Sequence, residues 1–296
     1  MPLFQDPPAQ QWSQRMDALF AAGVDKEIST DDRTFNKQGH RHPLGYPFSV
    51  IRDKVLRRGR TNFSEGYEHD VEEEELAPLT ADDKVLLYCS LNFRGHYHSS
   101  LKHFKNVKQQ LLNEFLVDKP VVIDIGCGPA TSALALAELF PNKPFDYIGI
   151  DSAKAMRQRG ASLLSDAKQG RIMHNACEIS FLTNWISIPI AKNATVLFNF
   201  AFFFASETLD EITLRSLAKC VRRVAIARKS RTVFISYTNA THAFSNCNYV
   251  TFLNLTELVP LEGRTDTIVH YLNRRGDPSS RKKQLYSFEF YPATFS

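Results

Sequence analysis

The chain has 296 residues, of which 43% are hydrophobic and 23% charged, and its formal net charge is +4. This length and hydrophobic content suffice for a sizeable core, either in one large domain with an extension or in two modest domains. The longest apolar runs fall well short of the roughly 20 residues that cross a bilayer, so we expect no membrane-spanning helix.

The first residues show no basic stretch followed by an apolar one, so we expect no secretory signal and predict a cytoplasmic protein. The five cysteines are widely spaced and form no CxxC pair, which predicts neither a disulfide framework nor a structural zinc site. Histidines cluster at 40–42 and 96–103, but no carboxylate or thiol lies at ligand spacing. We therefore predict no metal site.

Residues 1–118 contain helical periodicity in two stretches, 7–23 and 99–116, separated by segments rich in proline, glycine and charge. The acidic run at 68–76 is typical of a solvated linker. We therefore predict a mainly helical extension over residues 1–118, ahead of a second region that covers 119–296.

From residue 119 onward, predicted strands alternate with predicted helices. The strands are expected at 120–126, 145–151, 170–176, 194–204 and 231–237, and the helices at 131–140, 152–164 and 207–224, with a helix or loop at 181–186. This repeat predicts a parallel sheet with helices on both faces. The last two apolar segments, 266–273 and 282–292, flank a turn-rich stretch and predict an antiparallel hairpin.

The sequence "VVIDIGCGPA" at 121–130 joins the first of these strands to the first helix. A dinucleotide loop requires G-x-G-x-x-G, and Thr131 stands here in place of the third glycine. Pro129 removes a backbone N–H where a pyrophosphate needs donors, and Asp124 at the end of the strand would repel it. The loop therefore disfavours NAD and suits a ligand that carries an ammonium group.

The same ten residues resemble motif I of the class I S-adenosylmethionine-dependent methyltransferases, an acidic-x-Gly-x-Gly-x-(Gly/Ala) loop. The resemblance continues at "YIGIDSAKAM", residues 147–156, and covers about residues 119–292. It implies a Rossmann-like, seven-stranded α/β sheet that is parallel apart from the C-terminal antiparallel hairpin. It also implies that residues 119–296 bind S-adenosylmethionine and that the extension could act as a lid.

The resemblance further implies a set of cofactor-binding residues at the predicted strand ends: Asp124, Gly126, Cys127, Gly128, Asp151, Ser152, Met156, Cys177, Glu178 and Asn199. Asp151 would accept hydrogen bonds from both ribose hydroxyls, and Glu178 would contact the adenine if Cys177 ends the third strand. A purely structural alternative stays open, in which the glycines form a tight turn and the aspartates cap helices.

Three residues are candidates for catalysis by the same resemblance. Asn199 lies where such enzymes place groups beside the sulfonium methyl, although "NFAF" lacks the prolines of the (Asp/Asn)-Pro-Pro-(Tyr/Phe) pattern of exocyclic-amine methylation. Tyr97 and His98 precede the domain in a segment that could contact the cofactor or supply a general base. Each also has a structural alternative, as a group that satisfies backbone atoms or as part of a polar helix start.

The sequence thus predicts methyl transfer from S-adenosylmethionine to a small-molecule or nucleic-acid acceptor such as RNA. Basic runs at 157–160, 221–231 and 274–283 favour a nucleic acid, although they could equally be solvated helix ends and a hairpin tip. The phenylalanines around 200–204 favour a flat or apolar small acceptor. The alternative is a regulatory or interaction protein that binds the cofactor without turnover.

Overall fold

The computed structural model describes residues 13–57, 59–68, 76–116, 119–189, 194–227, 232–241, 243–257, 265–272 and 281–295. Most of the acidic run at 68–76 and of the basic run at 274–283 lies outside these residues, as does the end of the run at 221–231. Among the helices of the described ranges, none is both long enough and apolar enough to cross a membrane.

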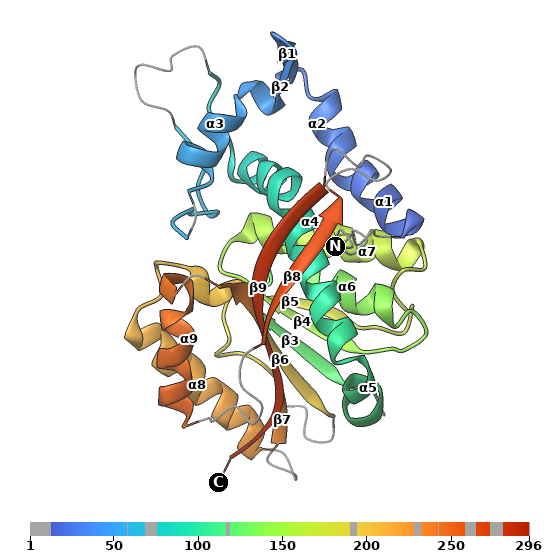
Figure 1. The fold of residues 1–296 in the computed structure, drawn as a ribbon, viewed down its shortest axis with the longest axis vertical. Helices are drawn as coiled ribbons and strands as arrows, with labels where there is room; N and C mark the ends of the chain where they lie inside the picture. The colour runs from blue at the N-terminus through green and yellow to red at the C-terminus, as the bar shows by residue number, and fades with distance from the viewer. Residues whose placement is uncertain are drawn as a thin grey trace, which may run out of the picture.

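A seven-stranded sheet forms the centre of the fold (Figure 1). Its strands, in spatial order, are β5 (Ile179–Leu182), β4 (Asp146–Ile150), β3 (Val121–Ile125), β6 (Val196–Ala201), β7 (Thr232–Ala240), β9 (Arg281–Thr294) and β8 (Thr265–Leu272). The first five pair in parallel, and β9 runs antiparallel to both β7 and β8. The predicted class I methyltransferase sheet, with its C-terminal antiparallel hairpin, is confirmed.

The third parallel strand differs from the prediction. Residues 170–176 form turns and bends, and β5 begins only at Ile179. Ile172 and Met173 are buried where the chain turns back over the preceding helix, and both donate their backbone N–H to the Ala167 carbonyl. Their hydrophobicity therefore covers a helix end, whereas β5 is a short, half-buried edge strand with a weak signal.

Helices cover both faces of the sheet (Figure 1). One face carries α4 (Ala81–Asn106), α6 (Thr131–Leu139) and α7 (Lys154–Gln169), and the other carries α8 (Glu211–Ile226) and α9 (Ala243–Thr256). The strand residues alternate between two hydrophobic cores, since Val122 faces the first layer while Val121 and Ile123 face the second. The sequence analysis predicts no element at α9.

The extension consists of short elements followed by one long helix: α1 (Gln14–Phe20), η1 (Ala21–Asp25), α2 (Lys26–Thr30), β1 (Phe35–Lys37), β2 (His40–His42), η2 (Pro43–Gly45), α3 (Phe48–Val50), η3 (Ile51–Val55), α4, α5 (Lys108–Gln110) and η5 (Leu111–Phe115). The start of α4 is fixed by a capping box, because Thr80 and Asp83 each bind the other's backbone N–H. The helix then runs for 26 residues along the sheet face.

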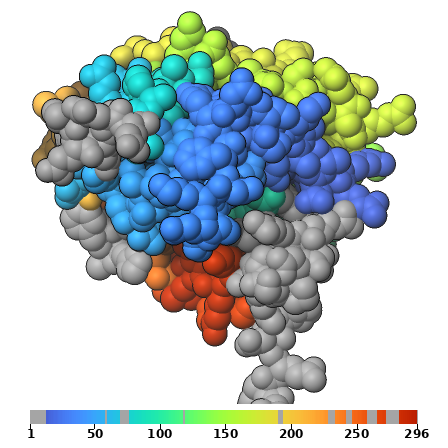
Figure 2. Space-filling view, turned by 90° about the horizontal axis from the view of Figure 1, so that it is seen from above, coloured from blue at the N-terminus to red at the C-terminus, as the bar shows by residue number. Residues whose placement is uncertain are grey.

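The short elements of the extension lie over one end of the sheet. The chain finishes at the lower end of Figure 1 after β9, so the parallel strands, which run opposite to β9, point toward the upper end. Seen from above, residues 13–57 spread across this upper end (Figure 2). Met16 and Phe20 of α1 share one hydrophobic core with Ala133 of α6 and Leu163 of α7, which joins the extension to the sheet layer.

Candidate functional site

The strand order places a topological switch point between β3 and β6. From β3 the chain proceeds to β4 and β5 on one side, and from β6 it proceeds to β7 on the other. Ligands of open α/β sheets bind at the carboxyl ends of the strands at such a point. Here that position is occupied by residues 126–130, the loop between β3 and α6, which we call the motif I loop.

The motif I loop turns through left-handed backbone conformations. Gly126, Gly128 and Ala130 have φ angles of 67°, 50° and 61°, a region that favours glycine because other residues are strained there. A Cβ on Gly126 would also come within 2.6 Å of the ring of Phe203, whereas the nearest atom to a Cβ on Gly128 would be the sulfur of Met156, 3.9 Å away. Space therefore remains above Gly128.

The backbone donors of the loop are already engaged within the protein. Gly126 and Cys127 donate to the Ile150 carbonyl at 2.8 and 3.0 Å, Gly128 donates to Asp151 Oδ2 at 3.1 Å, and Ala130 donates to the Cys127 carbonyl at 2.9 Å. The remaining residue, Pro129, has no N–H. Phosphate loops direct several backbone N–H groups at the ligand, so this loop is not built to hold a pyrophosphate.

Asp151 lies directly after β4 and is half-buried beside the loop. Its Oδ1 accepts from the backbone N–H of Ala153 at 2.9 Å, and its Oδ2 accepts from Gly128. Burial raises the pKa of this carboxyl above its usual value, and these two backbone donors act in the opposite direction. Each oxygen of an ionised carboxylate can accept more than one hydrogen bond, so Asp151 retains acceptor capacity for two hydroxyl groups.

Three other predicted cofactor residues lie around the same point. Met156 is buried in the first turn of α7 with its sulfur facing Gly128, and Ser152 is exposed next to Asp151. Cys127 is buried, and this burial raises the pKa of its thiol well above the usual value, so it stays a protonated thiol at neutral pH.

The structure does not bring Cys177 and Glu178 to this point. Both residues precede β5 and therefore lie at the amino end of the parallel strands, opposite to the loop. The side chain of Glu178 is 82% exposed and contacts Lys119 at 3.2 Å. The carboxyl end of β5 is Leu182, whose carbonyl accepts the N–H of Asp151. The residues that follow Leu182 thus occupy the position expected for the adenine contact.

Asp124 and Asn199 form a buried pair beneath the loop. Asp124 is only 1% exposed; its Oδ1 accepts from Asn199 Nδ2 at 2.7 Å and its Oδ2 from the Tyr147 hydroxyl at 2.9 Å. Burial raises the pKa of Asp124 to about 6, although the two donors act to lower it. The sequence prediction treats these residues as separate contacts, whereas the structure joins them by a direct hydrogen bond.

Tyr97 and His98 lie in the packed core. Tyr97 donates to Glu138 of α6, and the ring of His98 stacks on Tyr271 of β8, with centroids 5.2 Å apart. Burial lowers the pKa of His98 to about 3, so the imidazole is neutral at physiological pH. Their assignment as catalytic groups stays a prediction, and it would require both side chains to leave these positions.

A different face of α4 approaches the site. Tyr88 and His96, two helical turns apart, are half-buried, and the Tyr88 hydroxyl lies 2.9 Å from His96 Nδ1. The ring of His96 stacks on Phe202 just after β6, with centroids 3.9 Å apart. Burial raises the pKa of Tyr88, and the negative charge of Asp151 adds to this rise, which places the tyrosine near the end of β4. The i, i+8 spacing is the only sequence signal for this pair.

Phe202 has an unusual backbone conformation for its residue type. Its φ is 62° and ψ 3°, in the left-handed region, which is strained for a bulky side chain. The conformation is held by its N–H, which donates to the Thr238 carbonyl at 2.8 Å, and by its ring contacts with His96 and Tyr286. Such strain concentrates at functional sites. Phe202 is also the final residue of the "NFAF" segment.

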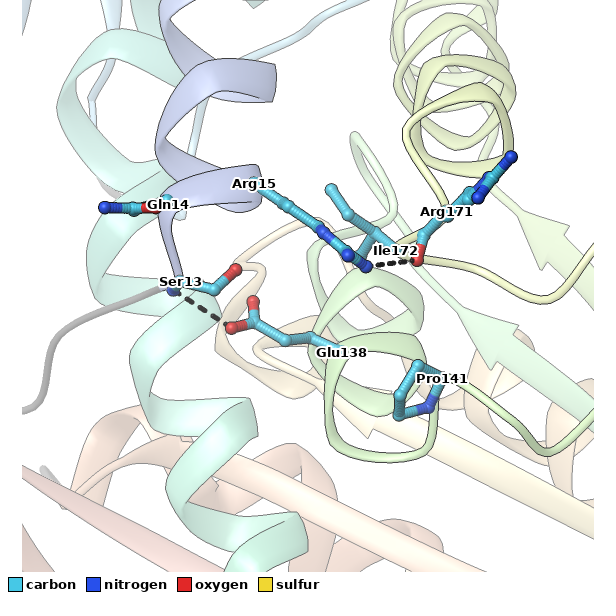
Figure 3. A pocket seen from close by; sticks show the side chains of 7 residues that line it. All are labelled: Ser13, Gln14, Arg15, Glu138, Pro141, Arg171 and Ile172. Carbon is cyan, nitrogen blue, oxygen red and sulfur yellow. Dashed lines mark hydrogen bonds between the residues drawn. The ribbon is translucent and has the colours of Figure 1, made fainter.

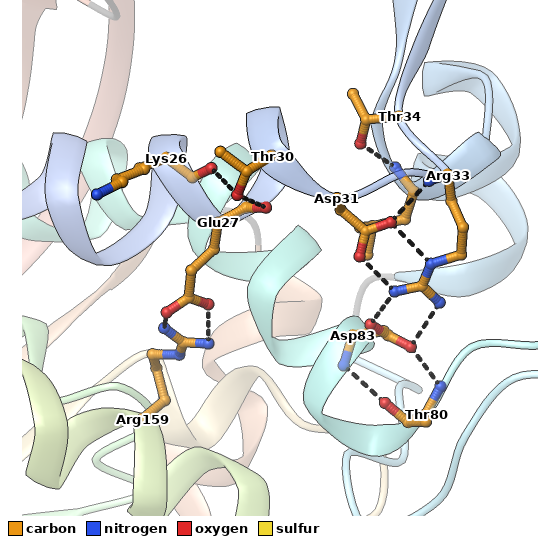
Figure 4. Close-up of polar contacts among 10 residues, drawn as sticks. Lys26, Glu27, Thr30, Asp31, Arg33, Thr34, Thr80, Asp83 and Arg159 are labelled. Carbon is orange, nitrogen blue, oxygen red and sulfur yellow. Dashed lines mark hydrogen bonds and ion pairs between the residues drawn. The ribbon is translucent and has the colours of Figure 1, made fainter.

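Ion pairs hold the extension over this end of the sheet (Figure 4). Arg159 of α7 binds both carboxylate oxygens of Glu27, at 2.9 and 2.7 Å, and donates to the Gly23 carbonyl at 2.8 Å. Arg33 binds Asp31 and Asp83 at 2.8 and 2.7 Å. Bidentate arginine–carboxylate contacts of this kind have a defined geometry, so α2 is fixed to α7 and the segment that follows α2 is fixed to α4.

A cavity of about 380 Å³ lies away from the loop, at the C-terminal ends of α6 and α7 (Figure 3). Glu138 on its wall accepts from the Ser13 N–H at 3.0 Å, and Arg15 donates to the Arg171 carbonyl at 3.2 Å. Since Glu138 is near the last residue of α6 and the loop precedes the first, this cavity is not part of the candidate site. Across the described part of the chain, no group of three or more potential metal ligands gathers.

No protein-family model matches the chain. Among curated proteins, it is 33% identical over 82 residues to a tRNA (guanine-N(7)-)-methyltransferase of Cytophaga hutchinsonii, which covers 27% of this chain and 36% of that protein. The chain therefore spans little more than a third of this relative's length.

Among solved structures, the chain is similar to a precorrin-6y C5,15-methyltransferase from Geobacter metallireducens, with a TM-score of 0.37 and 15% identity over 67% of this chain and 86% of that chain. It is also similar to an arsenic(III) S-adenosylmethionine methyltransferase from Chlamydomonas reinhardtii, with a TM-score of 0.39 and 12% identity over 66% of this chain and 73% of that chain. These likenesses concern the fold. The strand order itself is that of the class I S-adenosylmethionine-dependent methyltransferases.

Proposed function

We propose that the protein transfers a methyl group from S-adenosylmethionine to a small-molecule or RNA acceptor, in the cytoplasm. The observation that carries this proposal is the motif I loop at the switch point. The N–H groups of the loop are hydrogen-bonded within the protein, whereas the carboxylate of Asp151 beside it can still accept hydrogen bonds. A site with a free carboxylate acceptor, next to a loop whose own N–H groups are engaged within the protein, suits a nucleoside without a pyrophosphate.

The residues present fit this cofactor. Asp151 would accept the two ribose hydroxyls, Gly128 leaves room for the ligand above the loop, and Met156 would line its apolar side. When bound, the cofactor supplies an electrophilic methyl group on a positively charged sulfur. The chain's own contribution would be to orient the acceptor and to exclude water, which the extension above this end of the sheet supports.

We place the acceptor beside His96, Tyr88 and Phe202, because these residues form the contact between α4 and the end of β6. Their aromatic rings would stack on a flat acceptor, such as a nucleobase or a planar small molecule. The tRNA guanine named for the Cytophaga relative is one acceptor of this shape. His96 would then be the cofactor contact or general base that the sequence analysis expects at Tyr97 or His98. Asn199 would contribute from its buried position below the loop.

Calorimetric titration with S-adenosylhomocysteine and with NADH tests the cofactor. We expect binding of the first and none of the second, and the reverse result would contradict the proposal. Incubation with methyl-labelled cofactor and fractionated cell extract then tests the reaction, with Asp151→Ala as the control. Label in RNA or in a small molecule supports the proposal, whereas binding without any label would favour the regulatory protein without turnover.

A further inference from the structure

A row of polar side chains crosses the buried part of the sheet directly below the motif I loop. In the strand register, Asp124 of β3 lies opposite Asn199 of β6, and Asn199 lies opposite Ser236 of β7. All three are at most 1% exposed. Ser236 Oγ donates to Asn199 Oδ1 at 2.8 Å, and Asn199 Nδ2 donates to Asp124 Oδ1 at 2.7 Å.

The row is closed at each end by an aromatic side chain. At one end, His103 of α4 places its Nε2 at 3.1 Å from Ser236 Oγ, and its ring stacks on Phe288 of β9. At the other end, the Tyr147 hydroxyl donates to Asp124 Oδ2 at 2.9 Å. A continuous chain of hydrogen bonds therefore connects α4 with β7, β6, β3 and β4.

The hydrogen bonds in this chain all point toward Asp124. The single hydroxyl proton of Ser236 is donated to Asn199, so the oxygen of Ser236 accepts the Nε2–H of His103. Burial lowers the pKa of His103 to about 3, which keeps the imidazole neutral and suited to this donor role. Asp124 consequently accepts a donor on each of its two oxygens, an arrangement that favours the ionised carboxylate.

We propose that this chain holds a negative charge under the motif I loop for a cationic ligand, and that His103 and Ser236 are positioning residues for cofactor binding through Asn199 and Asp124. The inference rests on the proposed function, because S-adenosylmethionine carries an ammonium and a sulfonium group. A buried carboxylate attracts such charges more strongly than an exposed one, and without aligned donors burial would return it to the neutral acid.

The titratable groups around Asp124 are consistent with this assignment. Tyr147 and Cys127 both have pKa values raised well above their usual range by burial, so neither adds charge at neutral pH. Asp151 is the nearby anion, and its charge opposes ionisation of Asp124. The donors from Asn199 and Tyr147 act against both the burial and the repulsion and favour the ionised carboxylate, although the pKa of Asp124 stays raised to about 6.

The first experiment measures the titration of Asp124 without any ligand. The Asp124 carboxyl carbon is followed by NMR in aspartate-labelled protein from pH 4 to 8, with Asp124→Asn used for assignment. Ser236→Ala removes the donor that aligns Asn199, and we expect the titration midpoint to rise by about half a pH unit or more. His103→Leu should raise the midpoint as well, whereas His103→Gln, which keeps an N–H at similar reach, should restore it in part.

The matched control is Ser287→Ala. Ser287 is also a buried serine of this sheet, and its hydroxyl donates to Asp266 at 2.6 Å, outside the chain. This variant should leave the Asp124 midpoint unchanged even if it loses as much stability as Ser236→Ala. An unmoved midpoint in folded Ser236→Ala, or an equal movement in Ser287→Ala, would overturn the inference.

The second experiment measures calorimetric binding of S-adenosylhomocysteine from pH 5 to 8. Ser236→Ala should weaken binding about fivefold at pH 7 and move the loss of affinity at low pH to a higher pH, while Ser287→Ala binds like wild type. If the NMR midpoint moves in Ser236→Ala but the wild type does not bind S-adenosylhomocysteine, the hydrogen-bond chain controls the charge of Asp124 and the proposed cofactor is wrong. Binding that is identical in Ser236→Ala and wild type at every pH would contradict the positioning role.

Discussion

The ring of Phe203 lies directly over Gly126, so close that a Cβ at that glycine would be 2.6 Å from a ring carbon. The contact joins the motif I loop to the segment that follows β6, across the switch point of the sheet. It explains in physical terms why glycine is needed at the first loop position, since φ is 67° and the space above the residue is filled.

Gly126→Ala should therefore lower the free energy of unfolding by about 2–4 kcal/mol, through backbone strain together with the steric overlap. It should also abolish binding of S-adenosylhomocysteine. Chemical denaturation and calorimetry measure the two effects. Gly39→Ala is the matched control, because Gly39 has a φ of 77° but a Cβ there meets nothing within 4 Å among the described residues. Equal losses in the two variants would show that the contact with Phe203 is unimportant.

Asp151→Ala should weaken S-adenosylhomocysteine binding by about 100-fold, because two charge-assisted hydrogen bonds to the ribose would be lost. Calorimetric titration at pH 7.5 checks this. Asp146→Ala provides the control at the other end of β4, where the carboxylate contacts Lys119 at 2.7 Å. Unchanged affinity in Asp151→Ala, or an equal loss in Asp146→Ala, would contradict the location of the cofactor.

Asp124→Asn should change stability in a pH-dependent manner. The pKa of Asp124 is raised to about 6 by burial, so the folded state binds this proton more tightly than the unfolded state. Its contribution to stability is fully present below about pH 4 and is lost as the pH rises through about 6. At pH 8 the neutral asparagine should therefore be more stable than the aspartate, by up to about 3 kcal/mol.

Urea unfolding of wild type and Asp124→Asn at pH 4.5 and 8 measures this difference. The stabilisation should be present at pH 8, shrink at pH 4.5, and be accompanied by weaker S-adenosylhomocysteine binding. A stabilisation of the same size at both values would show that the charge of Asp124 is not responsible. Burial lowers the pKa of His103, so the pH dependence of its contribution has the opposite sign. That contribution to the stability of the folded state is lost as the pH falls below about 6.5.

Much of the site's framework follows from local sequence. The loop at 126–130 and the acid at 151 are specified by residues close together in the chain, and the alternation of strands and helices predicts the parallel sheet. Residues 170–176 are predicted as a strand but form turns, because Ile172 and Met173 cover the end of α7, a tertiary contact with no local signature. Because the strand begins only at Ile179, Cys177 and Glu178 precede it and lie away from the site.

The acceptor side depends still more on tertiary structure. Residues 96, 97 and 98 are consecutive in one helix, and each points in a different direction. His96 reaches Phe202, while Tyr97 faces α6 and His98 faces β8. Only the packing of α4 against the sheet decides which of them approaches the loop, so sequence alone identifies the segment but not the residue.

Arg159→Met should loosen the extension at the ion pair with Glu27. The contact is bidentate and the arginine side chain is only 16% exposed, so we expect a loss of about 1 kcal/mol and several-fold faster tryptic cleavage between residues 26 and 41. Arg52→Met is the control, since its pair with Asp53 is largely exposed. Cleavage at the wild-type rate in Arg159→Met would mean that this ion pair does not hold α2.

His96→Ala should impair methyl transfer to the acceptor without impairing cofactor binding. We expect methyl transfer to the labelled acceptor to fall at least tenfold, because the stack with Phe202 and the contact with Tyr88 are lost. S-adenosylhomocysteine affinity should stay within about twofold, since the cofactor contacts are at Asp151 and Gly128. His98→Phe, whose ring can keep the stack on Tyr271, should retain turnover. If His98→Phe loses methyl transfer at wild-type stability while His96→Ala keeps it, the catalytic contact belongs to His98, as the sequence analysis predicts.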